Sequence, residues 1–129
     1  NELKIIQGGP DGRYYDSGTM ESAIFDVGYS TAFNRFTSTT STPTNTNIQW
    51  QFAVADPVSG SCNSATFDFV GPDGTASSYY TATGSALLLN DDGTGYENPG
   101  RCLKYKAFLT TTDSNTTPVI PDITLNYSP

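Results

Sequence analysis

The stretch "NIQWQFAVAD", residues 47–56, carries the clearest strand pattern in the chain. Ile48, Trp50, Phe52 and Val54 alternate with glutamine and alanine, so every second side chain is large and apolar. Successive side chains of a β-strand point to opposite faces of the sheet, and this period of two therefore places the four residues on one buried face. We expect Trp50 to lie in the core.

A second stretch, "RCLKYKAFLT" at residues 101–110, follows the same rule. It places Leu103, Tyr105, Ala107 and Leu109 inward and the intervening lysines outward. Further strands are predicted at residues 23–27, 32–39, 65–70, 77–83, 85–90 and 123–127. About eight short strands separated by turn residues predict an all-β fold, an antiparallel β-sandwich of the jelly-roll type.

The length of 129 residues fits a single domain, 1–129, with residues 1–12 as an N-terminal juncture segment. Thirteen acidic residues against six basic ones give a net charge of −7, which disfavours a phosphate backbone, so we expect no nucleic-acid partner. No apolar run reaches about 18 residues, so we expect no membrane span. The start at Asn1, without an apolar leader, suggests a mature or trimmed ectodomain.

Cys62 and Cys102 are the only cysteines. An even count in a chain rich in Ser, Thr and Asn and poor in Lys predicts one disulfide and an oxidising location, extracellular or at the cell surface. Two free thiols are the alternative.

Turn residues punctuate the chain. "GPDG" occurs at 9–12 and at 71–74, each copy leading to a Tyr-Tyr pair, and its Pro, Asp and Gly suit successive turn positions. We interpret both copies as β-turns rather than as a repeated binding device. The Thr-rich stretch at 37–47 is predicted to form a hairpin whose tip lies near Pro43–Asn45.

The residue types argue against an enzyme. Without histidine the chain has neither a Ser-His-Asp nor a Cys-His pair, and no histidine-based zinc site. A carboxylate pair for glycoside hydrolysis remains a weaker alternative.

The loop "NDDGTGYEN", residues 90–98, is a candidate site for a structural Ca²⁺. It offers hard oxygen ligands in Asn90, Asp91, Asp92 and Glu97, with curvature permitted by its glycines. The loop lacks the EF-hand spacing, and a plain Asp-Gly turn explains it as well.

Two further sets of residues are candidates for binding. Tyrosines that could stack on sugar rings are Tyr14, Tyr15, Tyr79, Tyr80 and Tyr96, although strand alternation would bury one ring of each adjacent pair. Apolar residues near the start, Leu3, Ile5 and Ile6, have no evident strand partner and form a candidate interface with a neighbouring subunit.

The C-terminal third resembles a pattern found in β-sandwich modules of bacterial exported proteins. The matching residues are Arg101, Leu103, Tyr105, Lys106, Leu109, Thr110–Asp113, Thr117–Ile120 and Asp122–Leu125, and "SAIFDVG" at 22–28 is similar to the opening strand of the same modules. Such modules resemble galactose-binding-like jelly rolls, and they occur beside carbohydrate-active enzymes, in adhesins and in type IV pilin-like surface proteins. The stretch 1–22 looks like the juncture that follows a pilin helix.

The resemblance implies a non-enzymatic structural or adhesive domain of a bacterial surface filament or surface protein, with neighbouring subunits as partners. The alternative is a carbohydrate-binding module that recognises glycans through exposed tyrosines.

Overall fold

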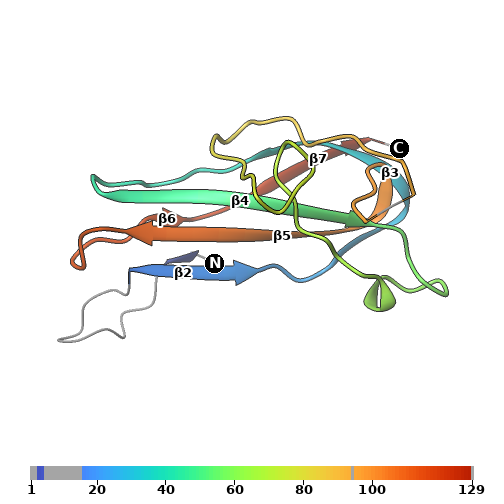
Figure 1. Cartoon of the computed structure of the whole chain (residues 1–129), viewed down its shortest axis with the longest axis horizontal. Helices are drawn as coiled ribbons and strands as arrows, with labels where there is room; N and C mark the ends of the chain where they lie inside the picture. The colour runs from blue at the N-terminus through green and yellow to red at the C-terminus, as the bar shows by residue number, and fades with distance from the viewer. Residues whose placement is uncertain (1–2, 5–15, 94, 129) are drawn as a thin grey trace.

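The computed structural model of the chain describes residues 3–4, 16–93 and 95–128. Their strands are β1 (Leu3–Lys4), β2 (Ser17–Glu21), β3 (Phe25–Thr37), β4 (Thr46–Ala55), β5 (Gly100–Thr111), β6 (Val119–Ile120) and β7 (Thr124–Ser128), with one short 3-10 helix at Cys62–Ser64 (Figure 1). All the pairings between these strands are antiparallel, and no α-helix is present among the described residues. The all-β class is therefore confirmed.

Strand β5 is the centre of the main sheet. It pairs with the whole length of β4, from Thr46 opposite Thr111 to Ala55 opposite Cys102. Its other edge pairs with β2 and then with the first residues of β3. The predicted alternation in β4 and β5 is confirmed, because Trp50 is only 2% exposed and Tyr105 only 7%.

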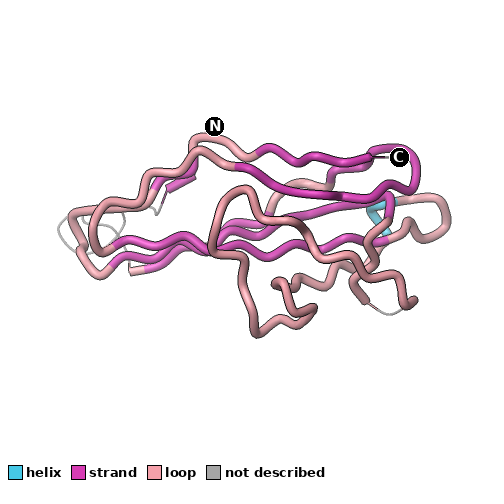
Figure 2. Tube along the Cα trace, turned by 90° about the horizontal axis from the view of Figure 1, so that it is seen from above, coloured by secondary structure: helices cyan, strands magenta, loops and turns pink. Residues whose placement is uncertain are grey.

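Strand β3 changes partner part-way along its length. Phe25, Asp26 and Thr31 pair with β5, whereas residues 32–37 pair with β7. Gly28 lies in the irregular stretch between Asp26 and Thr31, with a φ of 87°, a conformation that favours glycine. The strands predicted at 23–27 and 32–39 are thus two parts of one bent strand, and Figure 2 shows the strand pair at the C-terminus as a layer separate from the main sheet.

The core lies between these strands and is rich in aromatic rings. Phe36 of β3, fully buried, has its ring centroid 5.1 Å from that of Trp50, 4.8 Å from that of Phe52 and 5.9 Å from that of Tyr80. Aromatic pairs at such distances stabilise a core beyond the area that they bury. The rest of the buried cluster is Phe33, Ile48, Val54, Val70, Leu87, Tyr96, Leu103, Tyr105, Ala107, Leu109 and Ile120.

The segment between β4 and β5 departs from the prediction. The strands expected at 65–70, 77–83 and 85–90 do not form, and only single bridges join this segment to β3 and β4, such as Trp50 with Tyr80 and Phe52 with Val70. The segment also buries Gln51, which the alternation places on the open face. Gln51 is 4% exposed because its Nε2 donates to the carbonyls of Ala76 and Ser78 at 3.0 and 2.9 Å.

The turn predictions have two outcomes. The second GPDG is a turn, since the amide of Gly74 donates to the carbonyl of Gly71 at 3.0 Å; the first copy lies outside the described residues. A turn also occurs at Pro43–Thr46, but β3 and β4 do not pair with each other, so the hairpin prediction was wrong. Ser41 pairs instead with Val119, because the chain crosses between layers here.

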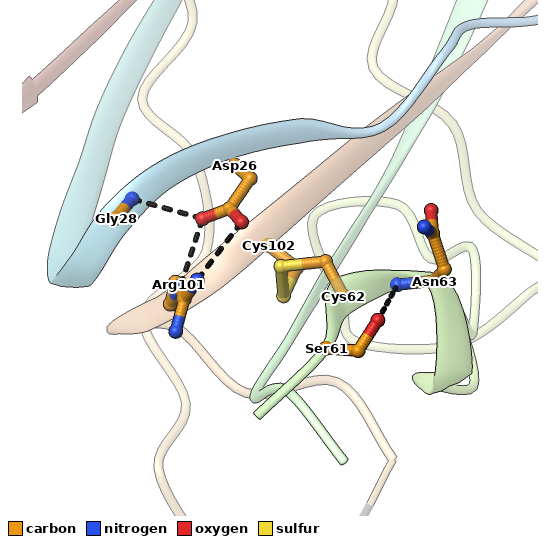
Figure 3. Close-up of polar contacts among 7 residues, drawn as sticks. All are labelled: Asp26, Gly28, Ser61, Cys62, Asn63, Arg101 and Cys102. Atoms are coloured by element: carbon orange, nitrogen blue, oxygen red, sulfur yellow. Dashed lines mark hydrogen bonds and ion pairs between the residues drawn. A yellow bond between two sulfur atoms is a disulfide. The ribbon is translucent and has the colours of Figure 1, made fainter. Parts of the chain in front are cut away.

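The predicted disulfide is present (Figure 3). Cys62, in the 3-10 helix after β4, is bonded to Cys102 of β5, with 5.7 Å between their Cα atoms. No free cysteine remains. The fold class, antiparallel pairing and disulfide are thus established, the count of eight strands is not confirmed, and the jelly-roll topology stays a prediction.

A buried asparagine joins the layer formed by β3 and β7 to the loop before β5. Asn98 is completely buried; its Oδ1 accepts from the Phe33 amide at 3.0 Å, and its Nδ2 donates to the carbonyls of Phe33 and Leu88 at 2.9 and 2.8 Å. These bonds satisfy main-chain groups that cannot reach water.

Replacing both cysteines by alanine is expected to lower the free energy of unfolding by about 4 kcal/mol, because the bond closes a loop of 40 residues in the unfolded chain. Urea unfolding with and without a reductant measures the loss. The reductant should shift the midpoint of the wild type and leave the double variant unchanged; equal midpoints throughout would contradict the prediction.

Asn98→Ala is expected to lower the free energy of unfolding by about 2 to 4 kcal/mol, because it leaves buried main-chain groups of β3 without partners. The exposed Asn126 of β7 supplies the control. Asn126→Ala should change stability by less than about 0.5 kcal/mol in the same urea experiment. Equal losses in the two variants would show that Asn98 does not join the layers.

Candidate functional site

A hollow beside the core runs between the bend of β3 and strand β7. We call it the β3–β7 groove; its volume is about 600 Å³. The residues that line it are Phe25, Asp26, Val27 and Phe33 from β3, and Ile123, Thr124, Leu125 and Tyr127 from β7 and the residue before it. Most of these side chains are apolar, so the groove offers a hydrophobic surface with a few polar groups at its rim.

The sequence accounts for the β7 wall of this groove. The alternation in "ITLNY", residues 123–127, predicts that Ile123, Leu125 and Tyr127 share one side of a strand, and all three line the groove. Ile123 and Leu125 pack against the core and are half-buried, whereas Tyr127 is 49% exposed. One face of the strand therefore serves both core and groove.

Two aromatic rings at the groove are held in place and still exposed. Phe25 is 43% exposed and stacks on Tyr105 of β5, with 6.3 Å between ring centroids. Tyr127 contacts Phe33 with a centroid distance of 5.9 Å. Rings supported on one side by other rings lose little conformational freedom when a partner covers the other side.

An ion pair fixes the polar rim of the groove (Figure 3). Arg101 of β5 donates from Nε to Asp26 Oδ1 at 2.8 Å and from Nη2 to Oδ2 at 3.0 Å, and the Gly28 amide donates to Oδ1 at 2.9 Å. These donors, Arg101 first, hold the pKa of Asp26 below its ordinary value of 3.8. The carboxylate thus stays charged and oriented at the bend of β3.

The far edge of β7 carries main-chain groups that no described strand pairs with. Residues 124–128 pair with β3 on one side, from Thr37 opposite Thr124 to Ala32 opposite Ser128, with a register shift between Phe33 and Arg35. In the described part of the chain no strand lies on the other side of β7. Such an edge is a template for an added strand.

The tyrosines singled out from the sequence do not gather into one platform. Tyr80 and Tyr96 are 2% and 4% exposed, so we remove both from the candidate glycan contacts. The Leu88 amide donates to the hydroxyl of Tyr80, and the hydroxyl of Tyr96 donates to the Leu88 carbonyl, so both buried hydroxyls have hydrogen-bond partners. Burial raises the pKa of each. Tyr79 is 36% exposed, and its ring meets the edge of Phe108 at 5.2 Å.

Tyr14 and Tyr15 lie outside the described residues, as do Ile5 and Ile6 of the predicted subunit interface. Leu3 lies in β1, opposite Ile120 of β6. The backbone of Leu3 therefore has a strand partner within the chain, which the sequence did not reveal.

A row of aromatic rings and lysines on the outer face of β5 was also missed. Lys104 Nζ lies 5.4 Å from the ring centroid of Phe67, and Lys106 Nζ lies 5.8 Å from that of Phe69 and 5.3 Å from that of Phe108. A cation that lies over the face of an aromatic ring is attracted to that ring. The alternation of residues 104, 106 and 108 predicts that their side chains share the outer face of β5. Only the tertiary structure brings the rings of residues 67 and 69 to that face.

The acidic loop is closed at its base, where Asn90 and Asn98 exchange main-chain hydrogen bonds of 2.9 and 2.8 Å. Asp91 and Asp92 are exposed, whereas Glu97 is buried. Burial raises the pKa of Glu97, and the nearby Asp91 and Asp92 raise it further, whereas the Gly93 amide lowers it slightly. Neither carboxylate oxygen of Glu97 has a hydrogen bond of ordinary geometry. The structure therefore brings the three predicted carboxylates into electrostatic contact.

Asn90 of this loop has a different role from the predicted one. Its Nδ2 donates to the carbonyl of Tyr96 at 3.1 Å, so it braces the loop. No three acidic or cysteine side chains among residues 3–4, 16–93 and 95–128 form a group that could hold a metal ion on their own.

Comparison with protein-family models, with curated proteins and with solved structures gives no match to this chain. The resemblance to galactose-binding-like modules therefore remains a prediction. Among the described residues no helix is long and apolar enough to cross a membrane.

The Asp26–Arg101 pair predicts a specific pH dependence of stability. A lowered pKa in the folded state stabilises the fold above the ordinary value of 3.8, and this contribution is lost as the pH falls through the folded-state pKa. Asp26→Asn should therefore be less stable than wild type at neutral pH, and the difference should close below pH 3.8. Urea midpoints over a pH series measure it. The difference should be smaller in an Arg101→Gln background, and a gap that persists at low pH would contradict the assignment.

Proposed function

We propose that this chain is a non-enzymatic, extracellular structural or adhesive domain of a bacterial cell-surface assembly of the type IV pilin-like kind, with a jelly-roll fold of the galactose-binding-like type. In this proposal the β3–β7 groove receives an extended segment of a neighbouring subunit. The observation that carries it is the apolar groove beside the open edge of β7.

The groove and the edge suit the same kind of ligand. An extended peptide that adds to a sheet edge gains main-chain hydrogen bonds, and pockets for its alternate side chains give specificity. β7 offers the edge, and Phe25 and Tyr127 offer exposed rings at the groove. Tyr is among the residues enriched where protein surfaces meet. Asp26 and Arg101 at the rim add charges that orient a partner.

The location in this proposal rests on the disulfide and on the composition. The Cys62–Cys102 bond is of a kind that persists in oxidising surroundings. The chain is rich in Thr, Ser and Asn, and its C-terminal third resembles modules of exported proteins. These observations favour the cell surface over a reducing compartment.

The absence of catalysis in this proposal rests on the residue types at the groove. Asp26 is the acidic residue of its lining, and both carboxylate oxygens accept from Arg101. A general base or acid needs a suitable pKa near the working pH, whereas the pKa of Asp26 is lowered. The chain contains no histidine to act in its place.

One observation keeps a carbohydrate-binding module as the second candidate. Phe25 and Tyr127 line one groove together with Asp26, and sugar sites likewise combine apolar rings with a few placed polar groups. In this reading the rings of Phe25 and Tyr127, rather than those of Tyr80 and Tyr96, contact the glycan.

Site-specific photo-crosslinking on the producing cell tests the protein-docking proposal. A benzophenone side chain at Tyr127 should give a discrete adduct with another subunit of the surface assembly, mapped by mass spectrometry to one extended segment. The same side chain at Tyr79, which is exposed beside β5 and away from the groove lining, is the matched control and should give none.

The alternative has a distinct outcome in a glycan array. Selective glycan binding that is lost in Tyr127→Ala and kept in Tyr79→Ala, together with no adduct from position 127, would overturn protein docking in favour of glycan recognition. An adduct from position 127 that Phe25→Ser abolishes would support docking.

A further inference from the structure

A buried carboxylate in the loop before β5 lacks a partner. Glu97 is 8% exposed, and both of its carboxylate oxygens are inaccessible to solvent and without a hydrogen-bond donor. A charged group buried in this way costs several kcal/mol unless a counter-charge or donors compensate it. Such a carboxyl group is neutralised either by a proton or by a bound cation, so the site favours a positive charge.

The described basic side chains do not supply that charge, because they are engaged elsewhere. Arg101 pairs with Asp26, Lys104 pairs with Glu21 at 3.4 Å, and Lys106 lies over the rings of Phe69 and Phe108. The remaining described guanidinium, that of Arg35, donates to the carbonyl of Gly84. None of these contacts involves Glu97.

The neighbours of Glu97 are also acidic. Asp91 and Asp92 lie close enough to its carboxyl group to interact with it electrostatically. A further carboxylate faces the same loop, because a Cβ placed on Gly95 would lie 2.8 Å from Asp68 Oδ2. Several negative groups therefore border one loop, and one of them is held away from water.

We propose that this loop binds a Ca²⁺ ion, with the Glu97 carboxylate as the buried ligand and the Asp91 carboxylate, main-chain carbonyls and water as further ligands. Calcium accepts six to eight oxygen ligands in a flexible geometry, including main-chain carbonyls and water, so it does not need a tight cluster of three carboxylates. The positive φ values of Gly93 and Gly95, 81° and 62°, allow the chain to curve around an ion.

The donor set separates calcium from other metals. The chain has no histidine, and both cysteines are in the disulfide, so the soft or nitrogen ligands that zinc and copper prefer are missing. Magnesium demands near-ideal octahedral geometry and gives up its water reluctantly, which suits a loop of mixed exposed and buried carboxylates poorly.

An ion here would act on the fold rather than on the groove. The Glu97 amide donates to the Val54 carbonyl of β4 at 2.9 Å, and the next residue, Asn98, holds Phe33 of β3. An ion bound to Glu97 would therefore stabilise the connection between β3 and β4. This inference does not depend on the proposed function.

Calorimetric titration of the full chain with CaCl2, after treatment with a chelator, tests the site. We expect one ion per chain, and in millimolar CaCl2 a rise in the melting temperature of roughly 5 °C or more relative to the chelator-treated protein. Glu97→Gln should weaken the affinity by about tenfold or more and remove most of the rise. Glu21→Gln, an equal loss of one negative charge on β2, should bind like the wild type.

Asp91→Asn provides a second variant if Glu97→Gln does not fold, because Asp91 is exposed and its replacement leaves the core intact. It should also weaken calcium binding while Glu21→Gln does not. No binding heat and no shift in melting temperature would overturn the proposal. An equal shift with MgCl2, or an equal calcium response in wild type and both loop variants, would also overturn it.

Discussion

The pairing of β4 with β5 is the constraint on which the rest of the structure depends. The two strands stay in register from Thr46 opposite Thr111 to Ala55 opposite Cys102, so their alternate side chains form one continuous inner face. A slip of β4 by one residue would turn Trp50 and Phe52 toward the outer face. The disulfide at the end of this pair joins Cys102 to the segment that follows β4.

The bend in β3 gives this sheet its second layer. The strand leaves β5 after Thr31 and brings Phe33 and Phe36 over the inner face, where the ring of Phe36 meets those of Trp50 and Phe52. The same bend places Phe25 and Asp26 beside β7. Core and groove therefore arise from one change of direction.

The periodic segments were predictable because local pattern and burial agree in them. The inward residues of β4 and β5 follow directly from alternation, and the turn at 71–74 follows from the preferences of Pro, Asp and Gly. Alternation failed where another part of the chain covers the outer face. Gln51 is buried because residues 76 and 78 accept its hydrogen bonds, and no local signal announces them.

By itself the sequence determined the all-β class, the inner faces of the long strands, the disulfide and the acidic character of the loop at 90–98. These are properties of spacing and residue type, which act over a few neighbours or leave only one pairing. The tertiary structure alone decided that β3 serves two partners, that Tyr80 and Tyr96 are core residues, and that Glu97 is buried among like charges. These outcomes depend on contacts between residues far apart in the chain, and such contacts leave no period in the sequence.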